Sequence, residues 1–284
     1  MHTERDFEND IEAALLANGG YQRGDPAGYD AERALFPADT LAFVQATQPK
    51  IWQYLESLHK DKTPAALIDS LAKELDSKGT LGVLREGFKC SGKTVKVAFF
   101  APNTGMDPQA QERYQANRLS VVRQVSTKSG AIPDLVVAVN GLPVATLELK
   151  NVMSATRWTV EHAKNQYKYE RDPREKLFAF KQRCLVHFAV DTEQVFMTTK
   201  LEGKDTFFLP FNRGFDHGAG NPPVEEDVRT SYLWHEVLVK DSLLDILARF
   251  MHLVVEEKTV ATEKGLKRHT KETMIFPRYH QLDA

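Results

Sequence analysis

The sequence predicts an α/β fold in which helices flank a mixed central sheet. Runs rich in β-branched and apolar residues recur at 119–125, 135–149 and 184–199, and such runs suit strands with buried faces. Segments with helical periodicity precede and separate them. The chain has 284 residues with 42% hydrophobic content, which is enough for a sizeable core.

The chain begins with an amphipathic segment. Phe7, Ile11 and Leu15 recur at every fourth residue before Gly19-Gly20, which predicts a helix over 5–18 closed by glycine. The next segments predict helices over 39–60 and 64–76, followed by strands near 81–88 and 94–101.

The segment from Gly87 to Thr94 matches the phosphate-loop pattern G-x4-G-K-[ST]. A true phosphate loop opens a helix, whose first amides bind the phosphates. Here an alternating apolar run, 95–100, follows the loop. We therefore expect a polar hairpin turn at this place and no ATP binding.

The centre of the chain predicts a β-hairpin that carries two carboxylates and an amine. Pro133-Asp134 precedes one apolar strand, Asn140-Gly141 forms a turn, and the next strand ends in Glu148-Leu149-Lys150. Side chains alternate along a strand, so Glu148 and Lys150 share one face. Charges on such an apolar strand are costly unless they meet a cation, a phosphate or each other.

The hairpin register decides whether Asp134 joins that face. A regular two-residue turn at Asn140-Gly141 would pair Val139 with Leu142 and leave Asp134 opposite Leu147, on the wrong face. We therefore expect a three-residue loop ending in Gly141, or an equivalent bulge near Asp134. The alternative for Glu148 and Lys150 is a salt bridge at an exposed strand edge.

A basic helical segment follows the hairpin. Residues 150–183 carry nine Lys and Arg against four acidic residues, which favours a positive strip along which a DNA backbone could lie. The residues that we expect to contact DNA are Lys164, Lys168, Arg171 and Arg174. A solvated helix face is the alternative interpretation.

The rest of the chain predicts two closing strands over 184–190 and 194–199, and then a helix over 242–255. His187 lies in an apolar run and is expected to be a core residue. We expect 256–271 to be a polar, charged linker, so that 1–255 forms the main domain and 256–284 leads away from it.

The residues of the hairpin carry a family resemblance. The segment DLVVAVNGLPVATLELKN resembles the N-terminal endonuclease region of the R (motor and restriction) subunit of type I restriction-modification enzymes, within the PD-(D/E)xK nuclease superfamily. The resemblance implies a restriction-endonuclease-like core that cuts double-stranded DNA with Mg²⁺, for which Mn²⁺ can substitute. It implies that Asp134 and Glu148 hold the metal and that Lys150 orients or activates the attacking water.

The resemblance also extends to residues outside the hairpin. FENDIEAALLANGGY resembles the start of the R subunit, where an acid on the first helix approaches the metal, so Glu8 is a candidate metal ligand. The family carries a Q-x-x-x-Y helix that assists catalysis. Gln166 and Tyr169 match it except that two residues, not three, separate them, which makes Tyr169 the weaker candidate.

The last residues, 276–284, resemble the adenine-reading glutamine motif that precedes the motor of superfamily 2 translocases. We expect the chain to be a nuclease fragment of a longer subunit, with ATP bound in the motor domains that follow. The resemblance implies modification and specificity subunits as partners. Two cysteines, no zinc spacing, no membrane-length apolar stretch and no signal peptide favour a cytoplasmic location.

Two other functions compete with this interpretation. A non-catalytic DNA-docking or scaffold module could retain the fold, although an intact set of Asp134, Glu148 and Lys150 argues against it. A stand-alone PD-(D/E)xK nuclease or junction resolvase would carry the same three residues. The charged segment 256–271 and the residues around Gln281 argue against that second alternative.

Overall fold

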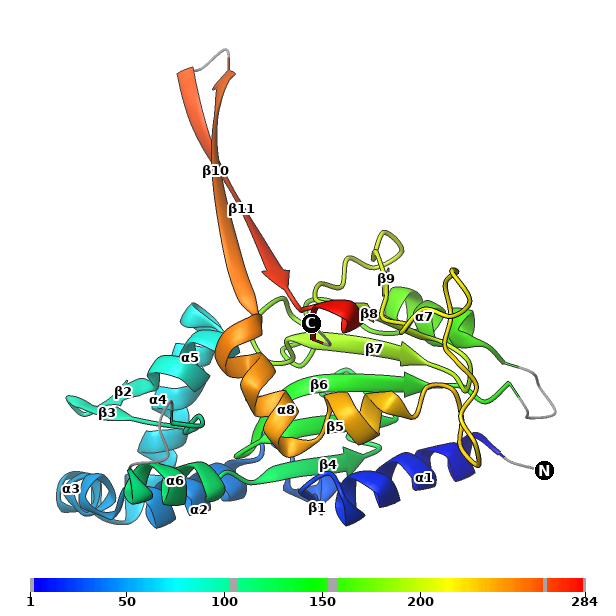
Figure 1. Cartoon of the computed structure of the whole chain (residues 1–284). Coiled ribbons are helices and arrows are strands. Elements are labelled where there is room, and N and C mark those ends of the chain that lie inside the picture. The colour runs from blue at the N-terminus through cyan, green and yellow to red at the C-terminus, as the bar shows by residue number, and fades with distance from the viewer. Residues whose placement is uncertain (1–2, 103–106, 153–157, 263–264, 283–284) are drawn as a thin grey trace.

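A seven-stranded mixed sheet forms the centre of the molecule (Figure 1). The computed structural model describes residues 3–102, 107–152, 158–262 and 265–282. The strand order is β1-β4-β5-β6-β7-β8-β9; β1 is parallel to β4, β6 is parallel to β7, and the other pairs are antiparallel. The strands are β1 Tyr21–Arg23, β4 Leu119–Arg123, β5 Leu135–Val139, β6 Leu142–Leu149, β7 Val186–Val190, β8 Val195–Thr198 and β9 Leu209–Pro210. The expected fold class is confirmed.

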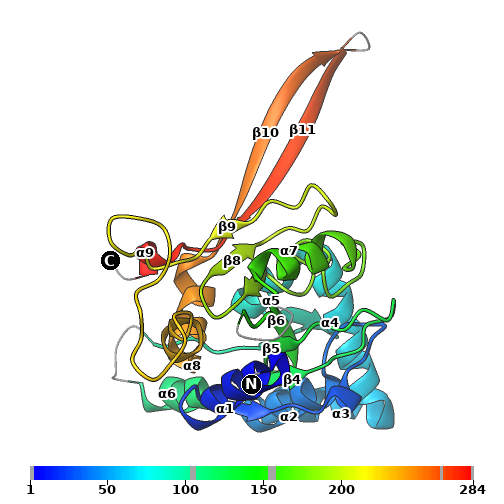
Figure 2. The same ribbon diagram turned by 90° about the vertical axis from the view of Figure 1, so that its right-hand side faces the viewer.

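Helices cover both faces of this sheet (Figure 2). The described helices are α1 Glu4–Ala17, α2 Pro37–Thr47, α3 Pro49–His59, α4 Thr63–Lys78, α5 Thr80–Glu86, α6 Pro108–Gln115, α7 Val160–Tyr169, α8 Lys240–Asp245 and α9 Tyr279–Leu282, with the short turns η1 Pro26–Gly28 and η2 Lys60–Lys62. Helix α1 packs on the face that carries Leu135 and Leu147. Helix α7 packs on the opposite face, which carries Val136 and Ala138. None of the described helices is long and apolar enough to cross a membrane.

The β5–β6 hairpin has a two-residue turn and a bulge. Val139 pairs with Leu142 across Asn140-Gly141, but the register shifts by one residue between Ala138 and Val137. The three-residue loop that we expected is therefore wrong. The expected alternative, a bulge, is present and puts Asp134 and Glu148 on the same face. This bulge lies nearer to the turn than to Asp134. Its position has a physical reason, because Pro143 opposite Ala138 has no N–H to donate to the ladder.

The turn itself is buried and tightly bonded. Asn140 and Gly141 both have positive φ, at 50° and 83°, as in the turns that suit twisted hairpins. The Asn140 side chain accepts from the Arg118 N–H at 2.7 Å and donates to the Val97 carbonyl at 2.9 Å. The Phe36 N–H donates to the Gly141 carbonyl at 2.8 Å. The turn therefore joins the helical N-terminal part to the sheet.

The N-terminal part differs from expectation in two places. The helix expected over 39–60 is divided into α2 and α3 at Gln48, because the residue before Pro49 disfavours helical geometry. The strand expected over 81–88 is helix α5, bracketed by Gly79 and Gly87 with positive φ. A short apolar run does not distinguish a buried helix from a strand.

The phosphate-loop-like segment forms a hairpin. Strands β2 Phe88–Cys90 and β3 Lys93–Val95 pair antiparallel across a Ser91-Gly92 turn, so that a strand and not a helix directly follows the loop. Its backbone therefore differs from a loop that opens a helix N-terminus. The strand expected over 94–101 is shorter than predicted.

The C-terminal part also differs from expectation. The helix expected over 242–255 ends earlier: α8 continues into the π-helical turn η4 Ile246–Phe250, and a second π-helical turn, η3 Leu233–Val237, precedes α8. The segment expected to be a linker forms a long antiparallel hairpin, β10 His252–Thr262 with β11 Gly265–Ile275, which projects from the body (Figures 1 and 2).

After the hairpin the chain returns to the body. The Phe276 ring contacts Phe188 and Phe211, and the Tyr279 ring contacts Phe211 and Tyr232. The residues after β11 are therefore anchored on the sheet by an aromatic cluster.

Replacement of Gly141 by alanine should destabilise the fold strongly. A Cβ at Gly141 would lie 2.4 Å from the Phe36 carbonyl oxygen, on a backbone with φ of 83°. We expect a loss of at least about 3 kcal/mol in unfolding free energy, measured by urea denaturation. Gly130→Ala is the matched control, since Gly130 has φ of 84° with nothing within 4 Å, and should cost about 1 kcal/mol. Equal losses for the two variants would contradict the role of the buried turn.

Candidate nuclease site

The site lies where β5 begins and β6 ends. Asp134 directly precedes β5, and its Oδ2 accepts a hydrogen bond from the Leu149 N–H at 2.7 Å. Glu148 is the penultimate residue of β6, and Lys150 follows the strand. The pairing of Leu135 with Leu147, continued by one residue, places Asp134 opposite Glu148. The bulge has therefore brought both carboxylates to one face.

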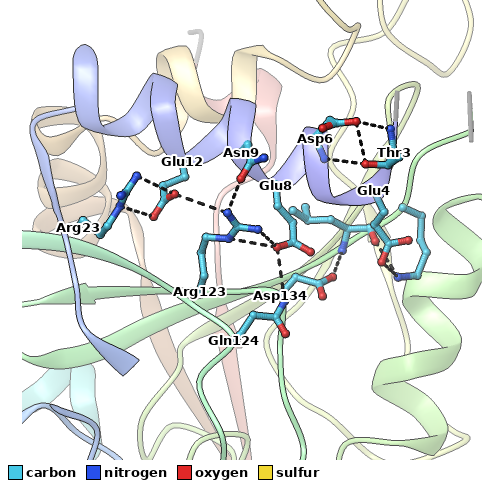
Figure 3. A network of polar contacts seen from close by, with 12 residues as sticks. Thr3, Glu4, Asp6, Glu8, Asn9, Glu12, Arg23, Arg123, Gln124 and Asp134 are labelled. Atoms are coloured by element: carbon cyan, nitrogen blue, oxygen red, sulfur yellow. Dashed lines mark hydrogen bonds and ion pairs between the residues drawn. The ribbon is translucent and has the colours of Figure 1, made fainter. Parts of the chain in front are cut away.

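Helix α1 adds two further carboxylates. The side-chain oxygens of Glu4, Glu8 and Asp134 lie within 4.8 Å of one another, and Figure 3 shows Glu4 and Glu8 on the helix directed toward Asp134. Glu8 was expected here, but Glu4 was not. The spacing of Glu4 and Glu8, four residues apart on one helix face, is the sequence signal that would have found it.

Three of the four carboxylates have a cationic partner. Lys150 Nζ lies 2.9 Å from Glu4 Oε1, Arg123 Nη2 lies 2.6 Å from Glu8 Oε2, and Arg171 Nε lies 2.7 Å from Glu148 Oε1. Within the described chain, Asp134 has the Leu149 backbone amide as its hydrogen-bond partner and no bonded cation. The centre therefore combines four acidic groups with three bases.

One atom of the site has an unmet bonding capacity. Glu148 is fully buried, and its Oε2 has no hydrogen-bond partner among the described residues. A buried carboxylate oxygen without a partner costs free energy. That cost is removed when a cation or a donor binds there.

Arg123 ties α1 to β4. It contacts Asn9 and Glu8, and its Nη1 lies 3.8 Å from Glu12 Oε2; Glu12 is also bound by Arg23 at 3.0 Å (Figure 3). This network fixes the rotation of α1 relative to the sheet. The direction of Glu8 toward Asp134 follows from it.

Burial changes the ionisation of both strand carboxylates. Burial, and the charge of Asp134 beside it, raise the pKa of Glu148 to about 8, although Arg171 and Lys150 act in the opposite direction. Burial also raises the pKa of Asp134 to about 6, against the bond from Leu149 and the charge of Lys150. Two like charges in one buried place are a common feature of functional sites.

Lys150 is held inside the site. Its side chain is 2% exposed, its Nζ donates to the Leu149 carbonyl at 2.7 Å, and the Trp158 ring lies 5.5 Å from the Nζ. A lysine buried beside carboxylates keeps its positive charge close to them. Asn151, the next residue, donates to the Thr3 carbonyl at 3.2 Å and so also joins α1 to the site.

Comparison with known families identifies the chain. The family model for the type I restriction enzyme R protein N terminus matches residues 1–206. The chain belongs to this family. No match is found among curated proteins. The matched range contains α1, the β5–β6 hairpin and α7, and therefore every residue of the site described above.

Helix α7 places the further residues expected of an R protein N terminus. The Val160 N–H donates to Asp191 Oδ2 at 2.7 Å, which fixes the start of the helix against the end of β7. Gln166 lies on the helix with a buried Oε1 that has no partner among the described residues. Tyr169 is 70% exposed. Tyr167 is the tyrosine that packs on the sheet, 2.8 Å from Thr146 Oγ1.

The residues of this R protein domain that were expected to contact DNA differ in how exposed their side chains are. Arg171 was expected to contact DNA, but its side chain is only 6% exposed and pairs with the buried Glu148. Lys164 pairs with Glu161 and lies 3.6 Å from the centre of the Phe196 ring. Arg174 is 88% exposed and pairs with Asp172. Much of the basic segment is therefore neutralised within the domain.

A surface cavity of about 690 Å³ lies beside the site. Its lining includes residues 129–132 together with Gln166, Lys168, Tyr169 and Arg171. Since Ile132 stands two residues before Asp134, this cavity is adjacent to the strand that carries the first carboxylate.

The pKa of Glu148 gives a pH-dependent stability. The folded protein holds a proton that the unfolded chain releases, so the free energy of unfolding should fall as pH rises from about 4.5 through about 8. Between pH 6 and 8 we expect a slope of up to roughly 1.4 kcal/mol per pH unit with EDTA present. Glu148→Gln should flatten that slope in urea denaturation. Parallel profiles for the two proteins would contradict the assignment.

Proposed function

We propose that the chain is the Mg²⁺-dependent DNA endonuclease domain of a type I restriction R subunit. One observation carries the proposal: Asp134 and Glu148 are buried on one face at the ends of adjacent strands, and Glu148 Oε2 has no partner among the described residues. The family match supports the restriction enzyme part of the proposal. Cleavage of DNA and the identity of the metal are proposed in addition to what the family match supports.

The residues at the site fit a hard divalent cation. Mg²⁺ and Mn²⁺ bind carboxylate oxygens and keep several waters. Asp134 and Glu148 Oε2 would hold the cation, and Glu8, whose oxygen lies within 4.8 Å of that of Asp134, would be a further ligand. A cation would also offset the two buried acidic groups, whose pKa values are raised to about 6 and about 8.

The chemistry follows from this arrangement. A bound divalent cation polarises the phosphodiester and lowers the pKa of the attacking water. Lys150 keeps an ammonium group at the same place, where it stabilises the negative charge that develops on the phosphate. Its bonds to Glu4 and to the Leu149 carbonyl fix the position of that ammonium. Asp134 is oriented by the Leu149 amide and needs no rearrangement to face the site.

DNA would approach over the cavity beside the site. Lys168, Gln166 and Tyr169 line it, and Arg174 lies exposed near its edge. An exposed aromatic ring and a lysine are suited to contacts with a sugar-phosphate backbone. Because Lys164 and Arg174 already pair with acidic residues, tight binding of DNA would depend on the remainder of an R subunit and on the modification and specificity subunits. ATP would act in the motor domains of that subunit.

Metal binding is the direct test in this chain. We expect the wild-type protein to bind Mn²⁺ in isothermal titration calorimetry, and Asp134→Asn and Glu148→Gln each to weaken binding by at least about tenfold, because each removes an anionic ligand. Asp69→Asn is the control, since Asp69 is an exposed carboxylate paired with Arg33, and should bind as wild type does. Equal affinity in all four proteins would refute the proposed site.

A further inference from the structure

The guanidinium of Arg171 contacts strand β6 beside one carboxylate and the segment that leads to the other carboxylate before β5. Its Nε donates to Glu148 Oε1 at 2.7 Å, at the end of β6. Its Nη2 donates to the Ile132 carbonyl at 3.0 Å, two residues before Asp134. One rigid group therefore bridges the two chain segments whose separation sets the distance between Asp134 and Glu148.

The contact with Glu148 is made through one oxygen. An arginine and a carboxylate commonly form a fork in which both oxygens are bonded. Here the second arm of the guanidinium goes to the backbone before Asp134, and Glu148 Oε2 remains without a partner in the described structure. The pair holds the carboxylate at one oxygen and leaves the other available.

We propose that Arg171 is a positioning residue for the cation site: it fixes Glu148 by Oε1 and the Asp134 segment by the Ile132 carbonyl, so that Glu148 Oε2 and Asp134 are presented together. This inference rests on the proposed function. It gives a role within the site to a residue whose place in the basic segment suggested a DNA contact.

The burial and geometry of Arg171 favour this role over a surface ion pair. The side chain is 6% exposed and the Glu148 side chain is fully buried, so solvent does not screen the interaction. A planar guanidinium fixes two acceptors at a set angle, whereas a lysine can hold one of them. Groups of this kind, which orient metal ligands, typically change metal affinity 10–100-fold when they are removed.

The test compares Mn²⁺ affinities of folded variants by isothermal titration calorimetry. We expect Arg171→Ala to raise the Kd about tenfold or more, and Arg171→Lys to give an intermediate value because it can still bind Glu148 Oε1. Guanidinium chloride at low millimolar concentration should partly restore binding in Arg171→Ala. Arg174→Ala is the control, since Arg174 is exposed and bonded to Asp172, and should show neither effect.

The outcomes separate this inference from the proposed function. If Arg171→Ala, shown to be folded by circular dichroism, binds Mn²⁺ within twofold of wild type while Asp134→Asn does not bind, the positioning role is refuted and the cation site stands. If Asp134→Asn and Glu148→Gln also bind as wild type does, the cation site itself fails. Should Arg171→Ala not fold, Arg171→Lys decides, and unchanged affinity in that variant refutes the positioning role.

Discussion

The one-residue bulge between β5 and β6 is the constraint on which the site depends. Because strand side chains alternate, a regular hairpin across Asn140-Gly141 would direct Asp134 and Glu148 to opposite faces. The bulge beside Pro143 shifts the register and brings both carboxylates to one face of the hairpin. The buried turn, held by bonds to α2 and to the residues before β4, keeps this register from slipping. The relative positions of Asp134 and Glu148, at the open end of the hairpin, are thus set by the bulge and the turn at its closed end.

Charge compensation is the second organising feature. Each element packed against the hairpin brings an acid, a base or both: α1 contributes Glu4 and Glu8, β4 contributes Arg123, and the residue after the C-cap of α7 is Arg171. Every one of these bases pairs with a different carboxylate, and Asp134 is left with a backbone partner. The elements that pack against the hairpin therefore also supply the charges that neutralise one another at the site. A cation between Asp134 and Glu148 would complete the charge compensation of the site.

The sequence was sufficient for the features that depend on local pattern. Alternation along β6 predicts that Glu148 and Lys150 share one face, and the family resemblance predicts Glu8, whose oxygen lies within 4.8 Å of that of Asp134. The sequence was insufficient where the interaction partner of a residue lies far away along the chain. Arg171 was assigned to the surface because its ion pair with Glu148 depends on how α7 packs. The β10–β11 hairpin was expected to be a linker because charged composition conceals a structure made by backbone pairing.

The most direct test of the proposed cation site is DNA restriction by an assembled type I enzyme that carries Glu148→Gln. We predict that DNA cutting is lost while ATP hydrolysis and translocation continue, because the substitution removes a proposed carboxylate ligand of the cation and leaves the motor unchanged. Intact cutting by that enzyme would refute this proposal, since no cation site built on Asp134 and Glu148 could then be the catalytic centre.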